Sequence, residues 1–564
     1  MSNILLVAWG GARYLSRPME PIDFNRHPSS YLHWKFFVDG PIARLVMEVQ
    51  EEKPWRPGYP LKLNSYDLGV DMELADVVQR LRFEHPDVRT LVVTSTRDKI
   101  FCAGANIYML QGSSHPFKVN FCKYTNETRI GLEEFARESG VRTLAALNGT
   151  ASGGGYELAI ACDEIHLIDD GSSAVSFPET PLLAVLPGTG GLTRLVDKRK
   201  IRRDVADVFC TVAEGFRGAK ALKTGLVDAV HSRSRFEAKV QERLQQIVAS
   251  APKSARHGPG VVLPPVRPTV DGDTLRYEHV TLEVSPKTRV ATLTVRTPKG
   301  PQPKDGAELL AAGGNAWAIA FARQLDDALL QLRFVLDTVG LVLLKTEGDA
   351  AAVLAVDAML AKHADHWLVK ETTLLIGRVL RRLDLTGRSF FALIEPGSCF
   401  AGTLFELALA ADRSYMLNDP QRPTHLQLSA MNAGKLPMPH GLSRLDCRFL
   451  GAPQKAKEAL AVREPIDAEQ AEELGLVTFA PDDIDWEDEV RVAIEERAAM
   501  SPDALTGMEA SLRFAGPESM ETKIFGRLSA WQNWIFTRPN STGDEGALSL
   551  YGRPERPVFD YRRT

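Results

Sequence analysis

The stretch LAALNGTASGGGYELAIACDEIHLI, residues 144–168, decides the fold of this chain. Its apolar start is typical of a buried strand, Asn148-Gly149 is typical of a turn, and three consecutive glycines lead into a helix with Glu157 in its first turn. Glycines let a backbone approach a ligand closely, and a helix N-terminus presents unpaired N–H groups at the positive end of its dipole. The stretch therefore predicts an oxyanion hole, in which N–H donors hold a carbonyl oxygen as it becomes negative.

Two further stretches supply what such a hole needs. FCAGANI at 101–107 adds a second glycine turn, and SFPETPLL at 176–183 adds a second carboxylate, Glu179, 22 residues after Glu157. Two carboxylates that face one water in an enclosed site cannot both ionise cheaply, so the pKa of one is expected to rise. We therefore predict that Glu157 and Glu179 act as general acid and base near neutral pH.

These blocks resemble the motifs of the crotonase (enoyl-CoA hydratase/isomerase) superfamily, in the same order. The matching residues are the AGA(D/N) turn at 103–106, the GGG-x-E block at 153–157, Pro178-Glu179, and PGTGGLTRL at 187–195. The resemblance implies that the backbone N–H groups of Ala105 and Gly154 hold the oxygen of an acyl-CoA thioester. It also makes Glu157 and Glu179 the catalytic pair. Asn106 stands where many members carry Asp, which leaves the backbone donor at Ala105 untouched.

The composition is that of a folded globular protein. Of its 564 residues, 44% are apolar and 25% are charged, and the formal net charge is −5. This balance provides no strong field to recruit nucleic acid or a membrane. The length suits three or four domains of about 150 residues, or two large ones.

The cysteines and the amino-terminal segment bear on the compartment. Six cysteines form no C-x-x-C pair and show no zinc-like spacing, so we expect a reduced, cytoplasmic protein without a metal site. The segment ILLVAW at 4–9 is too short for a signal core or a membrane span, and no basic residue precedes it. We interpret it as a buried strand.

The chain repeats itself at a nearly constant offset. The paired stretches are 81–96 with 332–347, offset by 251 residues, 157–168 with 406–417, offset by 249, and 187–195 with 437–445, offset by 250. Each copy alternates strand and helix patterns, the order that gives a parallel sheet with helices on its faces. We therefore predict an α/β protein that is a tandem duplication of the crotonase-type ββα-superhelix fold with a C-terminal helical region.

The repeat also predicts the domain boundaries. They are a catalytic crotonase-like domain over 1–250, a proline-rich linker over 251–273, a degenerate second crotonase-like domain over 274–450, and a C-terminal helical region of the second copy over 451–564. Five prolines and few apolar anchors suggest an extended linker on the surface.

The second copy lacks most of the predicted chemistry. Glu406 aligns with Glu157, but residues 401–405 read AGTLF and have lost the triple glycine. The counterpart of Glu179 falls near Ser429 with no carboxylate nearby, and 352–361 lacks the glycine turn. We expect a structural role for this half, with a second active site as the alternative.

Five residues are weaker candidates for contact with the substrate or coenzyme A. Lys62 and Leu63 lie where the family holds the coenzyme A moiety, Ala103 begins the AGA turn, and Tyr108 and Tyr124 flank the segment that lines the acyl site in this family. For the tyrosines, ordinary packing is an equal alternative. The Gly188–Gly191 run lacks the lysine and spacing of a Walker A loop and is interpreted as a turn rather than a phosphate site.

Over its whole length, with its degenerate copy and the extension FNRHPSSYLHWKF at 24–36, the chain resembles the crotonase branch that opens the ring of 2,3-epoxybenzoyl-CoA in aerobic benzoate degradation. The resemblance implies a carbon–carbon lyase that consumes two waters and releases 3,4-dehydroadipyl-CoA semialdehyde and formate. It implies no cofactor or metal, an acyl-CoA substrate with water as co-substrate, and a homodimer. Two alternatives stay open: an enoyl-CoA hydratase/isomerase acting on another acyl-CoA, and a non-catalytic acyl-CoA-binding scaffold.

Overall fold

A computed structural model describes residues 19–251 and 256–564. The segment 4–9, interpreted above as a strand, lies outside these ranges. The chain divides into two compact units. The amino-terminal unit comprises Phe24–Pro265 and His366–Glu371, and the carboxy-terminal unit comprises Val266–Asp365 and Thr372–Thr564 together with residues 19–23 of the described part.

A six-stranded sheet forms the base of the amino-terminal unit. Its order is β1 (Trp34–Asp39), β2 (Ile42–Met47), β3 (Thr90–Ser95), β5 (Arg142–Leu147), β7 (Glu164–Asp169) and β10 (Ala229–Ser232). β1 and β2 form an antiparallel hairpin, and the other neighbouring strands are parallel. This sheet is the α/β arrangement that the alternating strand and helix patterns predict.

The amino-terminal unit has a second, smaller sheet, and most of its strands directly follow a strand of the main sheet in the sequence. Its order is β4 (Lys99–Cys102), β6 (Gly149–Ser152), β8 (Ala174–Ser176) and β9 (Phe216–Arg217). β4 follows β3, β6 follows β5, and β8 follows β7, so the chain passes through a strand of each sheet before a helix. The glycine-rich turns of the predicted site lie at the ends of β4 and β6.

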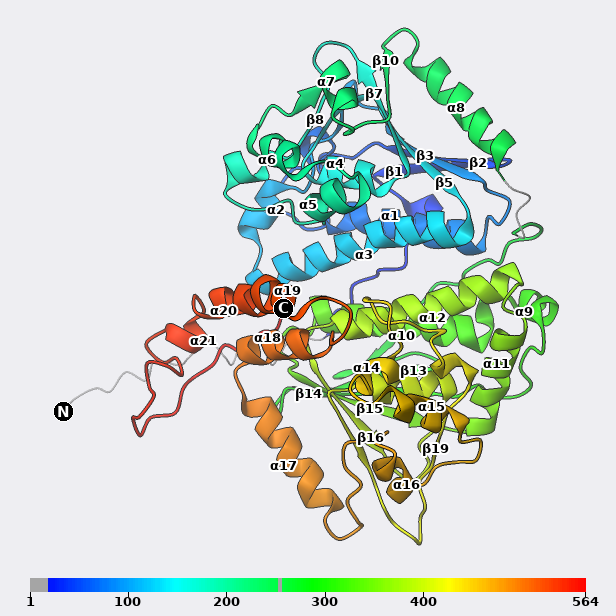
Figure 1. The fold of residues 1–564 in the computed structure, drawn as a ribbon, viewed down its shortest axis with the longest axis vertical. Coiled ribbons are helices and arrows are strands. Elements are labelled where there is room, and N and C mark those ends of the chain that lie inside the picture. Colours follow the sequence, from blue (N-terminus) through cyan, green and yellow to red (C-terminus); the bar gives the residue numbers. More distant parts are fainter. Residues whose placement is uncertain (1–18, 252–255) are drawn as a thin grey trace. The chain divides into compact units, whose positions relative to one another are not determined.

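The helices of this unit cover both faces of the main sheet, with α8 on one face and α1 and α3 on the other (Figure 1). They are α1 (Leu68–Phe83), α2 (Ile107–Gly112), α3 (His115–Ser139), α4 (Gly154–Ala161), α5 (Gly191–Thr193), α6 (Arg203–Thr211), α7 (Gly218–Lys223) and α8 (Phe236–Ser250).

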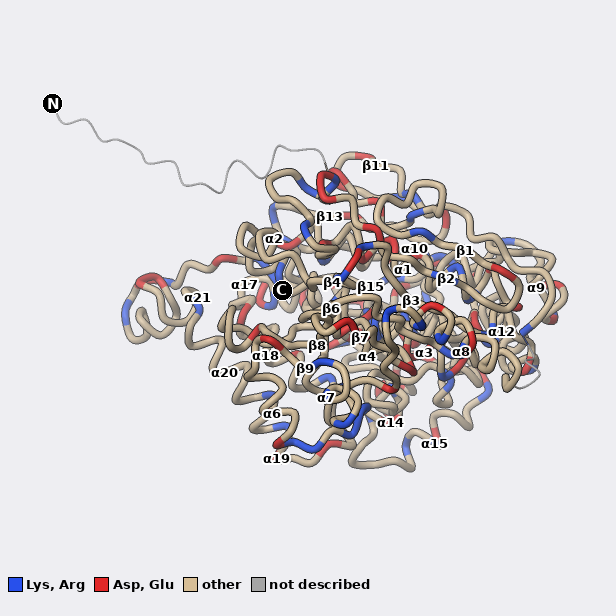
Figure 2. Tube along the Cα trace, turned by 90° about the horizontal axis from the view of Figure 1, so that it is seen from above, with Lys and Arg blue, Asp and Glu red and all other residues tan. Residues whose placement is uncertain are grey.

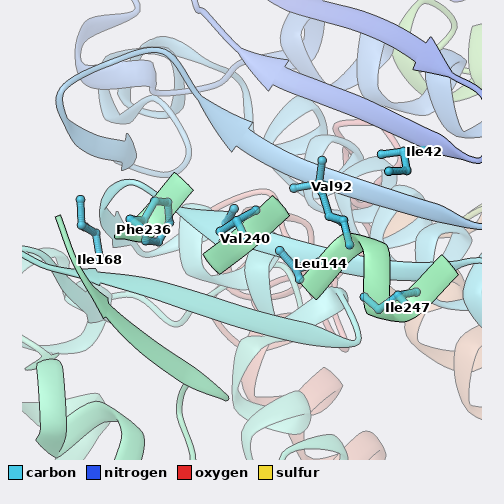
Figure 3. Packing of buried hydrophobic residues seen from close by; sticks show 9 residues of the cluster. Ile42, Val92, Leu144, Ile168, Phe236, Val240 and Ile247 are labelled. Atoms are coloured by element: carbon cyan, nitrogen blue, oxygen red, sulfur yellow. The ribbon is translucent and has the colours of Figure 1, made fainter. Parts of the chain in front are cut away.

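Alternation along the strands builds the core beneath α8 (Figure 3). Val92 and Leu144 point from β3 and β5 toward Phe236, Val240 and Ile247 of α8, which recur at helical spacing. All of these residues are buried, and full burial of each such side chain contributes about 1.5–3 kcal/mol. The strands are thereby fixed in register below the site.

The carboxy-terminal unit has a seven-stranded sheet of the same design. Its order is β11 (Thr269–Asp271), β12 (Thr274–Arg276), β13 (Val280–Ser285), β14 (Val290–Arg296), β15 (Leu341–Glu347), β16 (Ser389–Ile394) and β18 (Arg413–Met416). β13 and β14 form an antiparallel hairpin, and β14, β15, β16 and β18 are parallel. β17 (Phe400–Ala401) and β19 (Leu426–Gln427) form a separate parallel pair.

Helices make up most of the rest of this unit. They are α9 (Gly306–Ala312), α10 (Trp317–Phe334), α11 (Ala350–Lys362), α12 (Trp367–Leu385), α13 (Phe405–Ala410), α14 (Arg444–Arg448), α15 (Pro453–Ala461), α16 (Ala468–Glu473), α17 (Trp486–Ala499), α18 (Pro502–Leu512), α19 (Met520–Lys523), α20 (Ser529–Ile535) and α21 (Pro539–Thr542). The first residues of α12, up to Glu371, group with the amino-terminal unit.

Elements of the two units correspond along the sequence. α1 ends at Phe83 and α10 at Phe334, while β3 begins at Thr90 and β15 at Leu341, both an offset of 251. α8 begins at Phe236 and α17 at Trp486, an offset of 250. The core cluster under α17 repeats the one under α8, with Leu341, Phe391 and Leu393 from the strands and Trp486, Val490 and Ala493 from the helix.

The proline-rich segment is held more firmly than a surface linker would be. Val261, Leu263 and Val266 are buried, the Val261 N–H donates to the Phe83 carbonyl oxygen at 2.7 Å, and residues 269–271 form β11. The valine and leucine side chains between the prolines anchor this segment in the core, so the expected surface linker is wrong for residues 261–266.

Charged residues of both signs are spread over the chain. Acidic and basic residues interleave along the trace (Figure 2), and the formal net charge is −5. No helix in the described ranges is both long and apolar enough to cross a membrane.

Candidate active site

Glu157 lies in the first turn of α4 and is almost fully buried, with 2% of its surface exposed. Its Oε1 accepts hydrogen bonds from the backbone N–H groups of Thr189 and Gly191, both at 2.8 Å. The glycine run at 188–191 therefore wraps around this carboxylate, which supports its interpretation as a turn. Burial raises the pKa of Glu157, and these two N–H donors together with Arg129 oppose that rise.

Glu179 begins a short helical turn, Glu179–Leu183, that follows β8. Gly153 has a φ of 53°, and a Cβ at that position would lie 2.5 Å from Glu179 Oε1. Only glycine fits there, because the backbone is left-handed and the carboxylate fills the space of a side chain. Glu179 Oε2 is buried and has no hydrogen-bond partner in the described part of the chain. Burial, with Glu157 adding repulsion, raises the pKa of Glu179 to about 7.

The AGA turn is held by the backbone of Tyr66. The Tyr66 N–H donates to the Gly104 carbonyl at 2.9 Å, and the Asn106 N–H donates to the Tyr66 carbonyl at 2.8 Å. In such a parallel bridge the residue between, Ala105, points its own N–H away from Tyr66. Within the described ranges, neither the Ala105 N–H nor the Gly154 N–H donates to another backbone group.

Close packing places the AGA turn against the start of α4. Gly104 has a φ of 90°, and a Cβ there would lie 2.8 Å from the backbone nitrogen of Gly154. Asn106 caps α2 by accepting from the Met109 N–H at 2.9 Å, while its amide donates to the Pro60 carbonyl at 2.7 Å. The amide donor is what asparagine adds over aspartate here, and it ties the turn to the preceding loop.

The weaker candidates lie in different surroundings. Lys62 and Leu63 are exposed, and the Leu63 carbonyl accepts from the Ala103 N–H at 3.1 Å, so the predicted coenzyme A segment adjoins the AGA turn. Tyr108 is 60% exposed on α2. Tyr124 is buried on α3 against the ring of Phe24, with centroids 5.9 Å apart, which is the packing alternative left open above.

Several residues at this site were not predicted from the sequence. Besides the N–H groups of Thr189 and Gly191, they are the Cys122 thiol, whose pKa is raised to about 11 by burial and by Glu157, and the buried pair Asp71–Arg129. A charged residue on the apolar face of each of two long helices was the available signal for the pair, since charges are rarely buried unless paired.

The second half corrects one expectation about its carboxylates. Asp357, from α11, comes close to Ser429: its Oδ2 accepts from the Ser429 hydroxyl and from the Thr403 N–H, both at 2.7 Å. A carboxylate therefore does lie beside Ser429, supplied by a distant helix rather than by neighbouring sequence. Glu406 is also not alone, because it accepts from Asn432 at 2.7 Å and from Arg444 at 2.9 Å.

The amino-terminal part of the chain is similar in sequence to known proteins. The enoyl-CoA hydratase/isomerase family model matches residues 58–258, which contain every predicted catalytic residue. A carnitinyl-CoA dehydratase of Proteus mirabilis is 28% identical over 207 residues, covering 37% of this chain and 72% of the relative. An enoyl-CoA hydratase structure from Geobacillus kaustophilus is 30% identical and covers 39% of this chain and 78% of that chain, with a TM-score of 0.34.

One relative matches both units. The benzoyl-CoA-dihydrodiol lyase of Aromatoleum evansii is 54% identical over 548 residues, covering 96% of this chain and 98% of the relative. The chain therefore belongs to the enoyl-CoA hydratase/isomerase (crotonase) superfamily. Within that superfamily it is similar along its full length to a benzoyl-CoA-dihydrodiol lyase.

Proposed function

We propose that this chain is a crotonase-type lyase that opens the ring of an oxidised benzoyl-CoA in aerobic benzoate degradation. The observation that carries the proposal is the 54% identity to a benzoyl-CoA-dihydrodiol lyase across 96% of this chain and 98% of the relative. Relatives that match only the crotonase region leave the acyl group open, whereas this one shares the second unit as well.

The proposed substrate is 2,3-epoxybenzoyl-CoA. Two waters are consumed, the epoxide opens, and the two ring carbon–carbon bonds of one oxygen-bearing carbon break, so that this carbon leaves as formate. The remaining six-carbon acyl group is 3,4-dehydroadipyl-CoA semialdehyde, so carbon, hydrogen and oxygen balance. The scheme uses no metal, flavin or nicotinamide, and coenzyme A enters only as part of the substrate.

The proposed division of labour follows the site's geometry. The unpaired N–H groups of Ala105 and Gly154 hold the thioester oxygen, and one such donor contributes about 2.7–4 kcal/mol to transition states of this kind. Glu157 and Glu179 activate water and protonate the leaving oxygen. Because burial raises the pKa of both, a protonated and an ionised carboxyl can coexist near neutral pH.

We further propose that the two units arose by tandem duplication and that the second has a structural role. Matching element offsets, strand orders and core clusters support the duplication. The carboxylate of Asp357 on the Thr403 N–H supports the structural role, since that donor is already occupied. We expect a cytoplasmic homodimer with coenzyme A contacts at Lys62, Leu63 and Ala103 near the oxyanion turn.

Separate assays with two substrates test the proposal. Purified protein is assayed with 2,3-epoxybenzoyl-CoA for formate release and with crotonyl-CoA for hydration. We expect formate from the first substrate and at most trace hydration of the second. Efficient crotonyl-CoA hydration without formate would instead identify an enoyl-CoA hydratase. Binding of both acyl-CoAs without turnover would identify a scaffold.

A further inference from the structure

Behind the proposed oxyanion hole lies a buried ion pair that the scheme above does not use. Arg129 of α3 and Asp71 of α1 form a direct salt bridge with each side chain 1% exposed. The Thr128 hydroxyl also donates to Asp71 at 2.9 Å. Burying two charges is costly, and such a pair is weak evidence for stability, because apolar residues in its place are often neutral or stabilising.

Arg129 reaches the hole through Tyr66. Its guanidinium lies over the Tyr66 ring, 5.1 Å from the ring centroid. The Tyr66 hydroxyl oxygen is buried, makes no hydrogen bond of normal geometry in the described ranges, and lies 2.1 Å from where a Cβ on Gly154 would be. The ring therefore packs against Gly154, while the backbone of Tyr66 holds Gly104 and Asn106 on either side of Ala105.

In the second half, apolar residues stand at the positions that correspond to Asp71, Arg129 and Tyr66. At the offset of 251 shared by α1 and α10, Ala322 stands for Asp71 and Trp317 for Tyr66. At the offset of 247 between β5 and β16, which follow α3 and α12, Ile376 stands for Arg129. Ala322 and Ile376 line a cavity of about 10 Å³ beside Thr403, room for a single water at most.

We propose that Asp71, Arg129 and Tyr66 form a positioning unit for the oxyanion hole. Asp71 holds Arg129, Arg129 holds the Tyr66 ring, and Tyr66 aligns both donors, Ala105 through its backbone and Gly154 through its phenol. The inference rests on the proposed function for the oxyanion-hole role of Ala105 and Gly154 and for the identity of the acyl group. Arg129 also lies close enough to Glu157 to oppose the rise in its pKa.

The test replaces the pair with the residues of the second half, as the double variant Asp71→Ala/Arg129→Ile. No buried charge is left unpaired, so the fold should persist. The readout is the thioester C=O stretch of bound benzoyl-CoA, measured by difference Raman spectroscopy, which reports how strongly the two donors polarise the carbonyl. We expect the shift to lower wavenumber in the wild type to fall by at least about half in the variant. Turnover should fall by about 10–100-fold with KM within about threefold.

A matched control separates positioning from packing. Arg82 of α1 and Glu134 of α3 form another buried ion pair, at 3.3 Å. When both are replaced, the nearby Glu371 keeps Arg256 as a partner at 3.7 Å. Arg82→Met/Glu134→Leu should lower the melting temperature and leave the C=O band and kcat unchanged. If the Asp71/Arg129 variant behaves like this control, the pair is structural and the inference fails.

Two further outcomes are decisive. Should the double variant not fold, Tyr66→Phe decides: we expect a smaller C=O shift and a kcat lower by about 3–10-fold, whereas an unchanged band and rate would overturn the inference. Absence of formate release in the wild type would defeat the proposed function while leaving the C=O measurement valid. No polarisation of the carbonyl in the wild type would overturn the positioning unit itself.

Discussion

Glu157 and Glu406 begin equivalent helices in the two units, yet their partners differ in kind. Glu157 is held by two backbone N–H groups, while Glu406 is held by the Arg444 guanidinium and the Asn432 amide. Arg194, which stands 250 residues before Arg444, turns instead to Glu133 at 2.8 Å. Burial raises the pKa of both glutamates, and the partners of each oppose that rise. The comparison teaches that the turn following Glu157 holds its carboxylate through backbone N–H groups, whereas a buried salt bridge holds that of Glu406.

The backbone N–H groups at the starts of these two helices also differ in their partners. Gly153 and Gly402 share a left-handed backbone, with φ of 53° and 47°, and the residue after each offers an N–H at a helix start. In the second unit the Thr403 N–H already donates to Asp357, and a Cβ on Gly402 would overlap that carboxylate. An internal carboxylate thus occupies the position at which the first unit is proposed to receive a thioester oxygen.

The largest expected effect comes from the acids of the first half. Glu157→Gln and Glu179→Gln should each lower kcat by about 10²–10⁴-fold, the usual contribution of a positioned acid or base, with binding of a benzoyl-CoA analogue retained. Glu406→Gln should leave kcat within about threefold. Steady-state kinetics and calorimetric titration of the three variants measure this contrast. Equal losses in all three would show that the halves are not chemically distinct.

These same residues show how much of the fold and of the site the sequence predicts. The three ordered motifs and the offset near 250 predict the α/β fold and bring Glu157, Glu179, Ala105 and Gly154 into one region, because they fix strand ends and turns. Their catalytic roles stay predictions. The supporting partners were not predicted: the Thr189 and Gly191 N–H groups are backbone atoms, and nothing in the sequence pairs Asp71 with Arg129, which lie 58 residues apart on separate helices. Asp357 was not predicted beside Ser429 because it lies on α11, 72 residues earlier in the chain.

The next effect concerns stability of the second half. Asp357→Ala removes the acceptor of three hydrogen bonds, two from Thr403 and one from Ser429, and leaves buried donors unsatisfied. We expect a loss of about 2–4 kcal/mol in the free energy of unfolding of the carboxy-terminal unit, and kcat within about twofold. Asp357→Asn, which keeps an acceptor oxygen, should lose less. Appearance of a second benzoyl-CoA site in the alanine variant would show that Asp357 masks a competent hole.

Glu179 should make stability depend on pH. Its pKa is about 7 in the folded chain against 4.5 as the ordinary value, so between these values the folded state holds the extra proton. Its contribution to stability therefore falls as pH rises from about 4.5 to 7, and the full cost of the ionised form is present above 7. Glu179→Gln, which cannot ionise, should be more stable than the wild type by about 1–3 kcal/mol at pH 8 and nearly equal at pH 4. Denaturant unfolding at the two pH values checks this, and an equal gain at both would contradict it.

The smallest effect lies at the exposed edge of the oxyanion turn. Lys62 stands next to Leu63, whose carbonyl holds Ala103, while the second unit has Gly313 and Gly314 at the offset of 251 and so no cation there. If Lys62 meets a phosphate of coenzyme A, Lys62→Ala should raise KM by about 1.5–5-fold with kcat unchanged, since an exposed charge pair contributes only about 0.2–1 kcal/mol and the chemistry lies elsewhere. The effect should shrink at high salt, because screening weakens exposed pairs. Lys53→Ala, an exposed lysine earlier in the same loop, serves as the control. A loss of kcat in the Lys62 variant that does not depend on salt would show that Lys62 supports the oxyanion turn and does not bind coenzyme A.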